Sequence, residues 1–176
     1  MVLSSQQVIK KALASSSLEN WKNSPLHNSS EANTMLWLPV FQIDSGKTLG
    51  LTKNGYWASD SRDSVIVYEP GSSVLPLFPC LEIEYSKFRG LGKAAFSRLG
   101  LSERLIDTFP TSELVYLALT DVSGYWAELA LNWLEDIEID NRIKEQLQQI
   151  TKAKWASQKT RQKASKFLRG KIKQKT

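Results

Sequence analysis

The sequence has little of the chemistry from which most metal and nucleophile sites are built. It holds one histidine, His27, and one cysteine, Cys80. A single imidazole and a single thiol cannot supply the four Cys or His ligands of a tetrahedral zinc site, and a lone cysteine has no internal partner for a disulfide. We therefore expect no metal centre and no disulfide, and the reducing cytoplasm as the location.

Long apolar runs are missing too. No run approaches the roughly 18 residues that a membrane-spanning helix needs, and residues 1–17 lack the continuous apolar core of a secretory signal. We expect no transmembrane segment and no export. A composition of 41% hydrophobic and 23% charged residues in a chain of 176 is typical of one folded globular domain.

Two glycine-containing stretches approach phosphate-binding motifs without completing them. SGKT (45–48) matches the end of a P-loop, but position 41 is Phe where the pattern needs Gly, and no helix is predicted after it. GLGKAA (90–95) fits a variant of the dinucleotide fingerprint, but the returning parallel strand of a βαβ unit is not evident. We interpret the first as a hairpin turn and the second as a strand-to-helix junction, and we expect no cofactor.

Signs of catalytic chemistry are equally sparse. A nucleophilic pair of Cys80 and His27 is conceivable, but Cys80 lies at the entry to a predicted strand, where a small buried thiol is the usual occupant. Glu82 and Glu84 share a predicted strand face and suit a solvated surface as well as acid–base work. No Gly-x-Ser-x-Gly or HExxH motif occurs. We therefore expect a protein that is not an enzyme.

The pattern between residues 36 and 86 is that of strands. The stretches 36–43 and 64–71 are rich in β-branched and aromatic residues. Between them Asn54-Gly55 separates two short runs, which is a strong hairpin signal. LEIEY (81–85) alternates apolar and acidic residues. Together these stretches predict an antiparallel meander of about four strands.

Helical patterns flank this predicted sheet. An N-terminal helix is expected from Ser4 or Ser5 to about Trp21, followed by a loop over 23–34. After Gly90 the apolar period becomes helical, with helices expected over 91–99, from Thr111 or Ser112, over 123–137, and from Asp140 or Asn141 to about 150. The sequence thus predicts an α+β fold with an N-terminal helix, the meander, C-terminal helices that include an αα-hairpin, and a basic tail. The globular domain would cover residues 1–150 and the tail residues 151–176.

The strongest signal is the distribution of charge. Residues 1–150 carry 13 Lys/Arg and 18 Asp/Glu, whereas residues 151–176 carry 10 Lys/Arg and no acid. The apolar stripe of the preceding helix is interrupted where this charge begins, which predicts a second segment, amphipathic or disordered, that leaves the body. Such a segment is typical of polyanion binding, and the candidate residues are Lys152, Lys154, Trp155, Lys159, Arg161, Lys163, Lys166, Arg169, Lys171, Lys173 and Lys175.

Three kinds of partner suit this tail. Lysines on one side of a helix could face phosphates, which indicates binding to nucleic acid or a ribonucleoprotein. Trp155 can stack on a base. Phe167, Leu168 and Ile172 would instead favour weak attachment to an anionic membrane surface. An acidic protein is the third, and a disordered, solubilising tail without a dedicated partner is the remaining alternative. The acids Glu135, Asp136, Glu138 and Asp140 lie shortly before the tail, and they either pair with it within the molecule or form a solvated helix end.

A resemblance suggests a role for the body. The run WLPVFQIDSGKTLGL, followed by SVIVYEP and LPLFPCLEIEYSKF, is similar in rhythm to SMI1/KNR4-like domains over about residues 36–88. The resemblance implies an α+β interaction module, many of which serve as immunity proteins that bind toxins. We therefore expect a non-enzymatic binding or adaptor protein, whose body binds another protein and whose tail binds RNA, DNA or a ribonucleoprotein. The alternative is an immunity-type inhibitor that acts through its acidic body, and a small enzyme is the least favoured reading.

Overall fold

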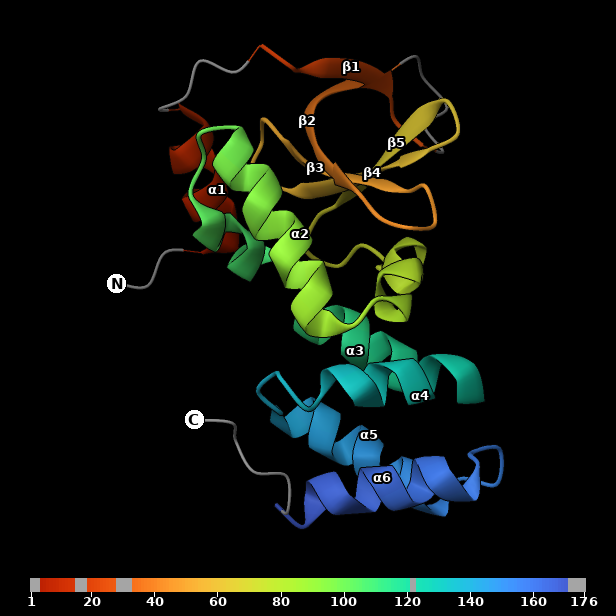
Figure 1. Cartoon of the computed structure of the whole chain (residues 1–176). Helices are drawn as coiled ribbons and strands as arrows, with labels where there is room; N and C mark the ends of the chain where they lie inside the picture. The colour runs from red at the N-terminus through yellow and green to blue at the C-terminus, as the bar shows by residue number, and fades with distance from the viewer. Residues whose placement is uncertain (1–3, 15–18, 28–32, 121–122, 171–176) are drawn as a thin grey trace. The chain divides into compact units, whose positions relative to one another are not determined.

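The computed structural model describes residues 4–14, 19–27, 33–120 and 123–170 (Figure 1). The chain forms two compact units, which are described separately below. The sheet unit comprises Met1–Ser73 and Lys87–Phe109, and the helical unit comprises Val74–Ser86 and Pro110–Thr176. The predicted mixture of helices and antiparallel strands is confirmed. Whether residues 151–176 act as a functional part of their own stays a prediction.

The sheet has five strands, one more than the sequence predicted. Its strands pair antiparallel in chain order, and they are β1 (Lys22–Pro25), β2 (Thr34–Gln42), β3 (Thr48–Thr52), β4 (Trp57–Ser61) and β5 (Ser64–Tyr68). The extra strand is β1, which lies where a loop was expected. Its sequence KNSP has no strand propensity, and it is extended because its backbone pairs with β2 from Lys22 opposite Trp37 to Pro25 opposite Thr34.

The sheet curls until its two edges approach one another, as the upper part of Figure 1 shows. The register of β2 shifts between Pro39 and Phe41, and such a bulge bends a strand. At the far edges, Leu26 pairs with Val65, and the N–H of His27 donates to the carbonyl of Val65 over 2.9 Å. The curl encloses one face of the sheet, and its apolar core consists of Trp37, Ala58 and Val65, with Leu26, Met35 and Val67 packed against them.

The other face of the sheet packs against helices. Phe41 contacts Phe88 of α2 (Tyr85–Arg98), with ring centroids 5.7 Å apart. Trp57 contacts Phe96 of the same helix at 5.9 Å and Phe109 at 5.1 Å, and its indole N–H donates to Thr108 at the end of the 3₁₀ helix η2 (Glu103–Thr108). These aromatic contacts hold α2 and η2 on the sheet.

The N-terminal helix is shorter than predicted. It is α1 (Ser5–Ala14), which buries Ile9 and Leu13. Residues 19–21 are not helical, so the expected extension to Trp21 is wrong, and residues 15–18 lie outside the described part of the chain. Because β1 begins at Lys22, the chain must already be extended there and cannot continue as a helix to Trp21.

The predicted strand over 81–85 is also wrong. The segment forms the 3₁₀ helix η1 (Leu75–Glu82), with Pro76 in its first turn, and α2 begins at Tyr85. Leu81 and Ile83 are buried although they do not belong to a strand, so their alternation with the glutamates mimicked a sheet pattern. Gly90 and Gly92 consequently lie inside α2 and not at a strand-to-helix junction. A side chain at Gly92 would come within 2.4 Å of Ile106, so this glycine permits close packing of α2 on η2.

The helical unit contains η1 and the C-terminal helices. In chain order these helices are α3 (Thr111–Thr120), α4 (Gly124–Trp133), α5 (Asn141–Lys152) and α6 (Gln158–Leu168). Helix α3 packs on α4 and α5, and α6 packs on α5 and α4. Trp133 is buried, and its indole N–H donates to the carbonyl of Ile83 over 2.9 Å. The segment that was expected to leave the body therefore returns to it over α6, whose Thr160, Ala164 and Phe167 are buried.

Candidate polyanion-binding site

The turn between α5 and α6 is held by side chains of the basic segment itself. Ser157 caps α6, because its hydroxyl accepts from the backbone N–H of Thr160 over 3.0 Å. The guanidinium of Arg161 donates to the carbonyl oxygen of Ala153, the C-cap of α5, and to that of Ala156 in the turn. Arg161, predicted to bind a polyanion, thus has a structural role in the turn.

Helix α6 presents a polar and cationic face opposite its buried one. Gln158, Gln162, Lys166 and Arg169 follow one another at steps of four, four and three residues, so they share one side of the helix, and all four are exposed. No acidic residue occurs anywhere in residues 151–170. This side of α6 therefore offers hydrogen-bond donors and positive charge, with no acid contributed by the segment itself.

Two other lysines of α6 turn toward acids on and after α4. Lys159 pairs with Glu128, and Lys163 pairs with Glu135 over 2.8 Å while also donating to Asn132 over 2.6 Å. Of the two alternatives left open for the acidic group before the tail, the structure shows pairing for Glu135. Glu128 lies on α4 and was missed, because the sequence does not show which acids of α4 meet α6. Pairs at the surface contribute only about 0.2–1 kcal/mol each.

The remaining lysines and Arg169 of the segment, within the described residues, are not held in ion pairs. Four cations form no ion pair within the described residues, and all are exposed: Lys152 at the end of α5, Lys154 in the turn, Lys166 on α6 and Arg169 at its C-cap. Trp155 is half-buried in the turn between them. Lys171, Lys173 and Lys175 lie outside the described residues. The structure thus brings some of the predicted residues to one exposed surface and diverts Lys159, Arg161 and Lys163 to contacts within the unit.

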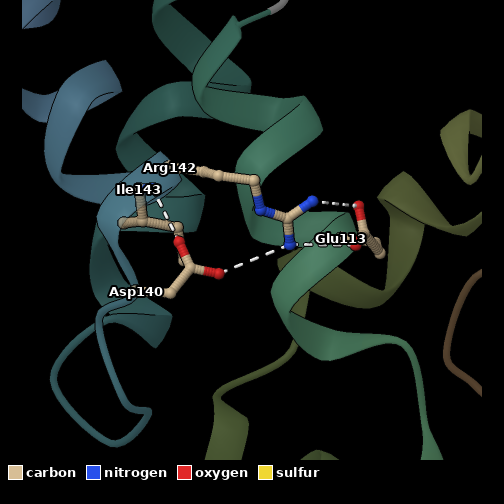
Figure 2. Close-up of polar contacts among 4 residues, drawn as sticks. All are labelled: Glu113, Asp140, Arg142 and Ile143. Atoms are coloured by element: carbon tan, nitrogen blue, oxygen red, sulfur yellow. Dashed lines mark hydrogen bonds and ion pairs between the residues drawn. The ribbon is translucent and has the colours of Figure 1, made fainter.

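The acid nearest the start of α5 belongs to a different cluster, drawn in Figure 2. Asp140 caps α5 by accepting from the N–H of Ile143 over 2.9 Å, and that bond, assisted by Arg142, holds the pKa of Asp140 below its usual range. Arg142 donates with both terminal nitrogens to Glu113 of α3 at 2.9 and 3.3 Å. The pKa of Arg142 is therefore raised, mainly by Glu113 and to a smaller extent by Asp140. The guanidinium also lies 5.2 Å from the ring centroid of Tyr116. This cluster ties α5 to α3 and leaves Asp140 unavailable to the basic segment.

The other candidates from the sequence have structural explanations. Cys80 lies in η1 with 0% of its surface exposed, so its thiol is closed to a substrate in solution. SGKT forms the turn between β2 and β3, with Gly46 at φ 84°, and Lys47 donates to the backbone carbonyl of Asp60 over 3.2 Å. That turn matches the hairpin predicted from the sequence. Within the described ranges no three His, Cys, Asp or Glu residues gather as metal ligands.

Comparisons with protein-family models, with curated proteins and with solved structures find no match for the chain. The similarity to SMI1/KNR4-like domains therefore remains one of sequence rhythm. In the described part of the chain, no helix combines the length and the apolar character that crossing a membrane requires.

Proposed function

We propose that the protein is a non-enzymatic binding protein that attaches to a polyanion, nucleic acid first, through the exposed face of α6 and the adjoining turn. One observation carries this proposal: Lys152, Lys154, Lys166 and Arg169 are exposed and form no ion pair within the described part of the chain. Cations that are not neutralised within the molecule are free to replace the counterions of a phosphate backbone.

The packing of α6 favours such binding. Because Thr160, Ala164 and Phe167 fix the helix on α4 and α5, its basic side chains start from a defined surface and little backbone entropy is lost when a ligand binds. Gln158 and Gln162 on the same face add donors for phosphate or sugar oxygens. These contacts read charge and shape, so RNA and DNA are both suitable ligands.

An anionic membrane is less suitable for the same surface. Membrane attachment would use Phe167 and Leu168 as apolar anchors, yet Phe167 is only 7% exposed and Leu168 is 36% exposed. Ile172 lies outside the described residues. A single partly exposed leucine adds little to the electrostatic attraction, so lipid binding would be weaker than nucleic-acid binding.

For the rest of the chain we keep recognition of another protein as the proposed role, with the cytoplasm as its site of action. Leu75 and Tyr125, both in the helical unit, are the most exposed large apolar side chains of the described residues, at 48% and 56%. Exposed apolar side chains are common at protein interfaces. The alternative is an immunity-type inhibitor, in which acidic groups of the body would bind the partner and the basic helix would be dispensable.

The test uses point variants, because deleting residues 151–176 would remove Phe167 and uncover apolar surface on α4 and α5. K154Q/K166Q/R169Q removes three exposed cations of the site. K53Q/K93Q/R98Q removes three exposed cations of the sheet unit and is the matched control for net charge. Each protein is titrated with a fluorescent single-stranded RNA of mixed sequence and, separately, with vesicles that contain phosphatidylserine.

The proposal expects the site variant to bind RNA at least about tenfold more weakly than the control variant, with little binding of any protein to vesicles. Equal RNA binding by the two variants would contradict it. Vesicle binding that the site variant loses, without RNA binding, would assign the surface to membranes instead.

A further inference from the structure

The enclosed face of the curled sheet is apolar in one part and polar in another. Side chains on a strand alternate between its two faces, so Asp60 lies on the same enclosed face as Ala58, two residues away. Lys22 shares that face because it pairs with Trp37. Thr48 shares it because it lies two residues from Gly50, which pairs with Ala58. Part of this face is the apolar core around Trp37, Ala58 and Val65. Toward the β4–β5 turn it becomes polar, and there it opens as a recess of about 240 Å³ lined by Lys22, Ser24, Trp37, Thr48, Asp60, Arg62, Asp63 and Ser64.

The recess is built by close packing around Trp37. Gly50 of β3 lies beneath the indole, since a Cβ at that position would come within 2.8 Å of Trp37 Cε3. The indole N–H donates to the hydroxyl of Ser24 on β1 over 3.0 Å. Trp37 thus has a fixed orientation in the wall of the recess, with its polar atom already satisfied.

The charged side chains around the recess are two cations and two carboxylates. Asp60 accepts from the backbone N–H of Thr48 over 2.8 Å, which holds its carboxylate in the lining of the recess. Within the described residues, no ion pair joins Lys22 or Arg62 to Asp60 or Asp63, so both signs of charge remain open to a ligand. Charges that face one small space without pairing favour a ligand that carries both signs.

The turn that carries two of these charges is strained. Arg62 has φ 53°, and it is the one non-glycine residue with positive φ among the described residues. Such a conformation is costly for a residue with a side chain, and glycine would adopt it freely. The turn therefore keeps an arginine where glycine would be more stable, and the arginine side chain lines the recess.

We propose that this recess binds a small zwitterion, a free α-amino acid, with Arg62 and Lys22 on its carboxylate and Asp60 and Asp63 on its ammonium group. The volume is below the roughly 300–1,000 Å³ of pockets that hold drug-sized ligands, so a nucleotide is too large and an amino acid is of suitable size. A purely anionic ligand would face Asp60 and Asp63, and a purely cationic one would face Lys22 and Arg62.

The experiment follows the indole N–H signal of Trp37 by NMR while glycine, L-serine and L-glutamine are added to the full chain at millimolar concentration. N-acetylglycinamide, which carries neither charge, is the ligand control. The expected result is a saturable shift of the Trp37 signal with at least one free amino acid and none with the blocked compound. The indole signal of Trp57, whose N–H is bonded to Thr108, should stay in place.

Two variants connect the shift to the recess. R62G should weaken binding about tenfold or more while keeping the fold, because glycine suits the φ of this position. D63N should also weaken it, and R98Q on α2 should leave it unchanged. No shift of Trp37 with any of the three amino acids, equal shifts with N-acetylglycinamide, or unchanged affinity in both R62G and D63N would overturn the proposal.

Discussion

Lys163 of α6 pairs with Glu135, just after α4, over 2.8 Å. Lys163 belongs to the basic segment and Glu135 to the acidic group that precedes α5. Asn132 of α4 accepts a second hydrogen bond from the same ammonium group. With the pair of Lys159 and Glu128, this contact places acidic groups beside a surface that we propose binds polyanions.

Removing these acids should strengthen polyanion binding. E128Q/E135Q releases Lys159 and Lys163 from their partners and takes two negative charges from the vicinity of the ligand. Because surface pairs are worth about 0.2–1 kcal/mol each, loss of the two pairs should raise RNA affinity by about twofold to thirtyfold. E69Q/E103Q, which removes two exposed acids of the sheet unit, is the control for net charge. An equal rise in both double variants would mean that net charge alone, and not these pairs, governs binding.

Helix α6 should depend on Phe167 for its stability. F167A removes a buried ring and should lower the free energy of unfolding of the helical unit by about 3–5 kcal/mol. L168A, at the neighbouring and partly exposed position, should cost much less. Urea denaturation and hydrogen exchange of the α6 amides measure both effects. Equal and small losses would show that α6 is not packed on α4 and α5 in solution.

The cap of α5 should make the helical unit sensitive to acid. The pKa of Asp140 is lower in the folded chain than in the unfolded one, so its stabilisation is fully present above the unfolded pKa and is lost as the pH falls through the folded pKa. D140A should cost about 1 kcal/mol at neutral pH. D140N keeps an acceptor for the N–H of Ile143 without the charge, so it should stay close to wild type at neutral pH and lose less stability between pH 6 and pH 3. Parallel pH profiles of D140N and wild type would contradict this account.

The two glycines of GLGKAA should respond oppositely to alanine. Nothing lies within 4 Å of a Cβ at Gly90, so G90A should stabilise the helix by about 0.5–1 kcal/mol. A Cβ at Gly92 would lie 2.4 Å from Ile106, so G92A should destabilise the sheet unit by about 1–3 kcal/mol. Thermal unfolding of the two variants checks this. If both are stabilising, α2 and η2 are not in close contact.

The sequence predicted best where local patterns and burial agree. Asn54-Gly55 marked the turn between β3 and β4, and the cap at Asp140 marked the start of α5. The sequence pattern gave the wrong secondary structure where tertiary contacts determine it. The polar stretch KNSP is a strand only because β2 pairs with it. LEIEY alternated like a strand because Leu81 and Ile83 are buried around a 3₁₀ turn.

The candidate site was predicted as a list of cations. The sequence could not show which of them remain exposed and which form contacts within the protein. Lys159, Lys163 and Lys166 all lie on α6, whereas Lys152 ends α5 and is separated from them by the turn at residues 153–157. Arg161 holds that turn, and Lys159 and Lys163 meet acids whose positions depend on how α4 packs. No short stretch of the sequence predicted the recess beside Trp37, because its lining residues come together only when the sheet curls.

The most direct test of the account is the salt dependence of RNA binding for wild type and for K154Q/K166Q/R169Q. If the three cations each neutralise a phosphate, the slope of log K against log salt should be less steep in the variant by about two units, since each contact to a single strand contributes about 0.7. The control variant K53Q/K93Q/R98Q should keep the wild-type slope. Equal slopes for wild type and the site variant would mean that RNA does not bind at this surface, and the central claim would be wrong.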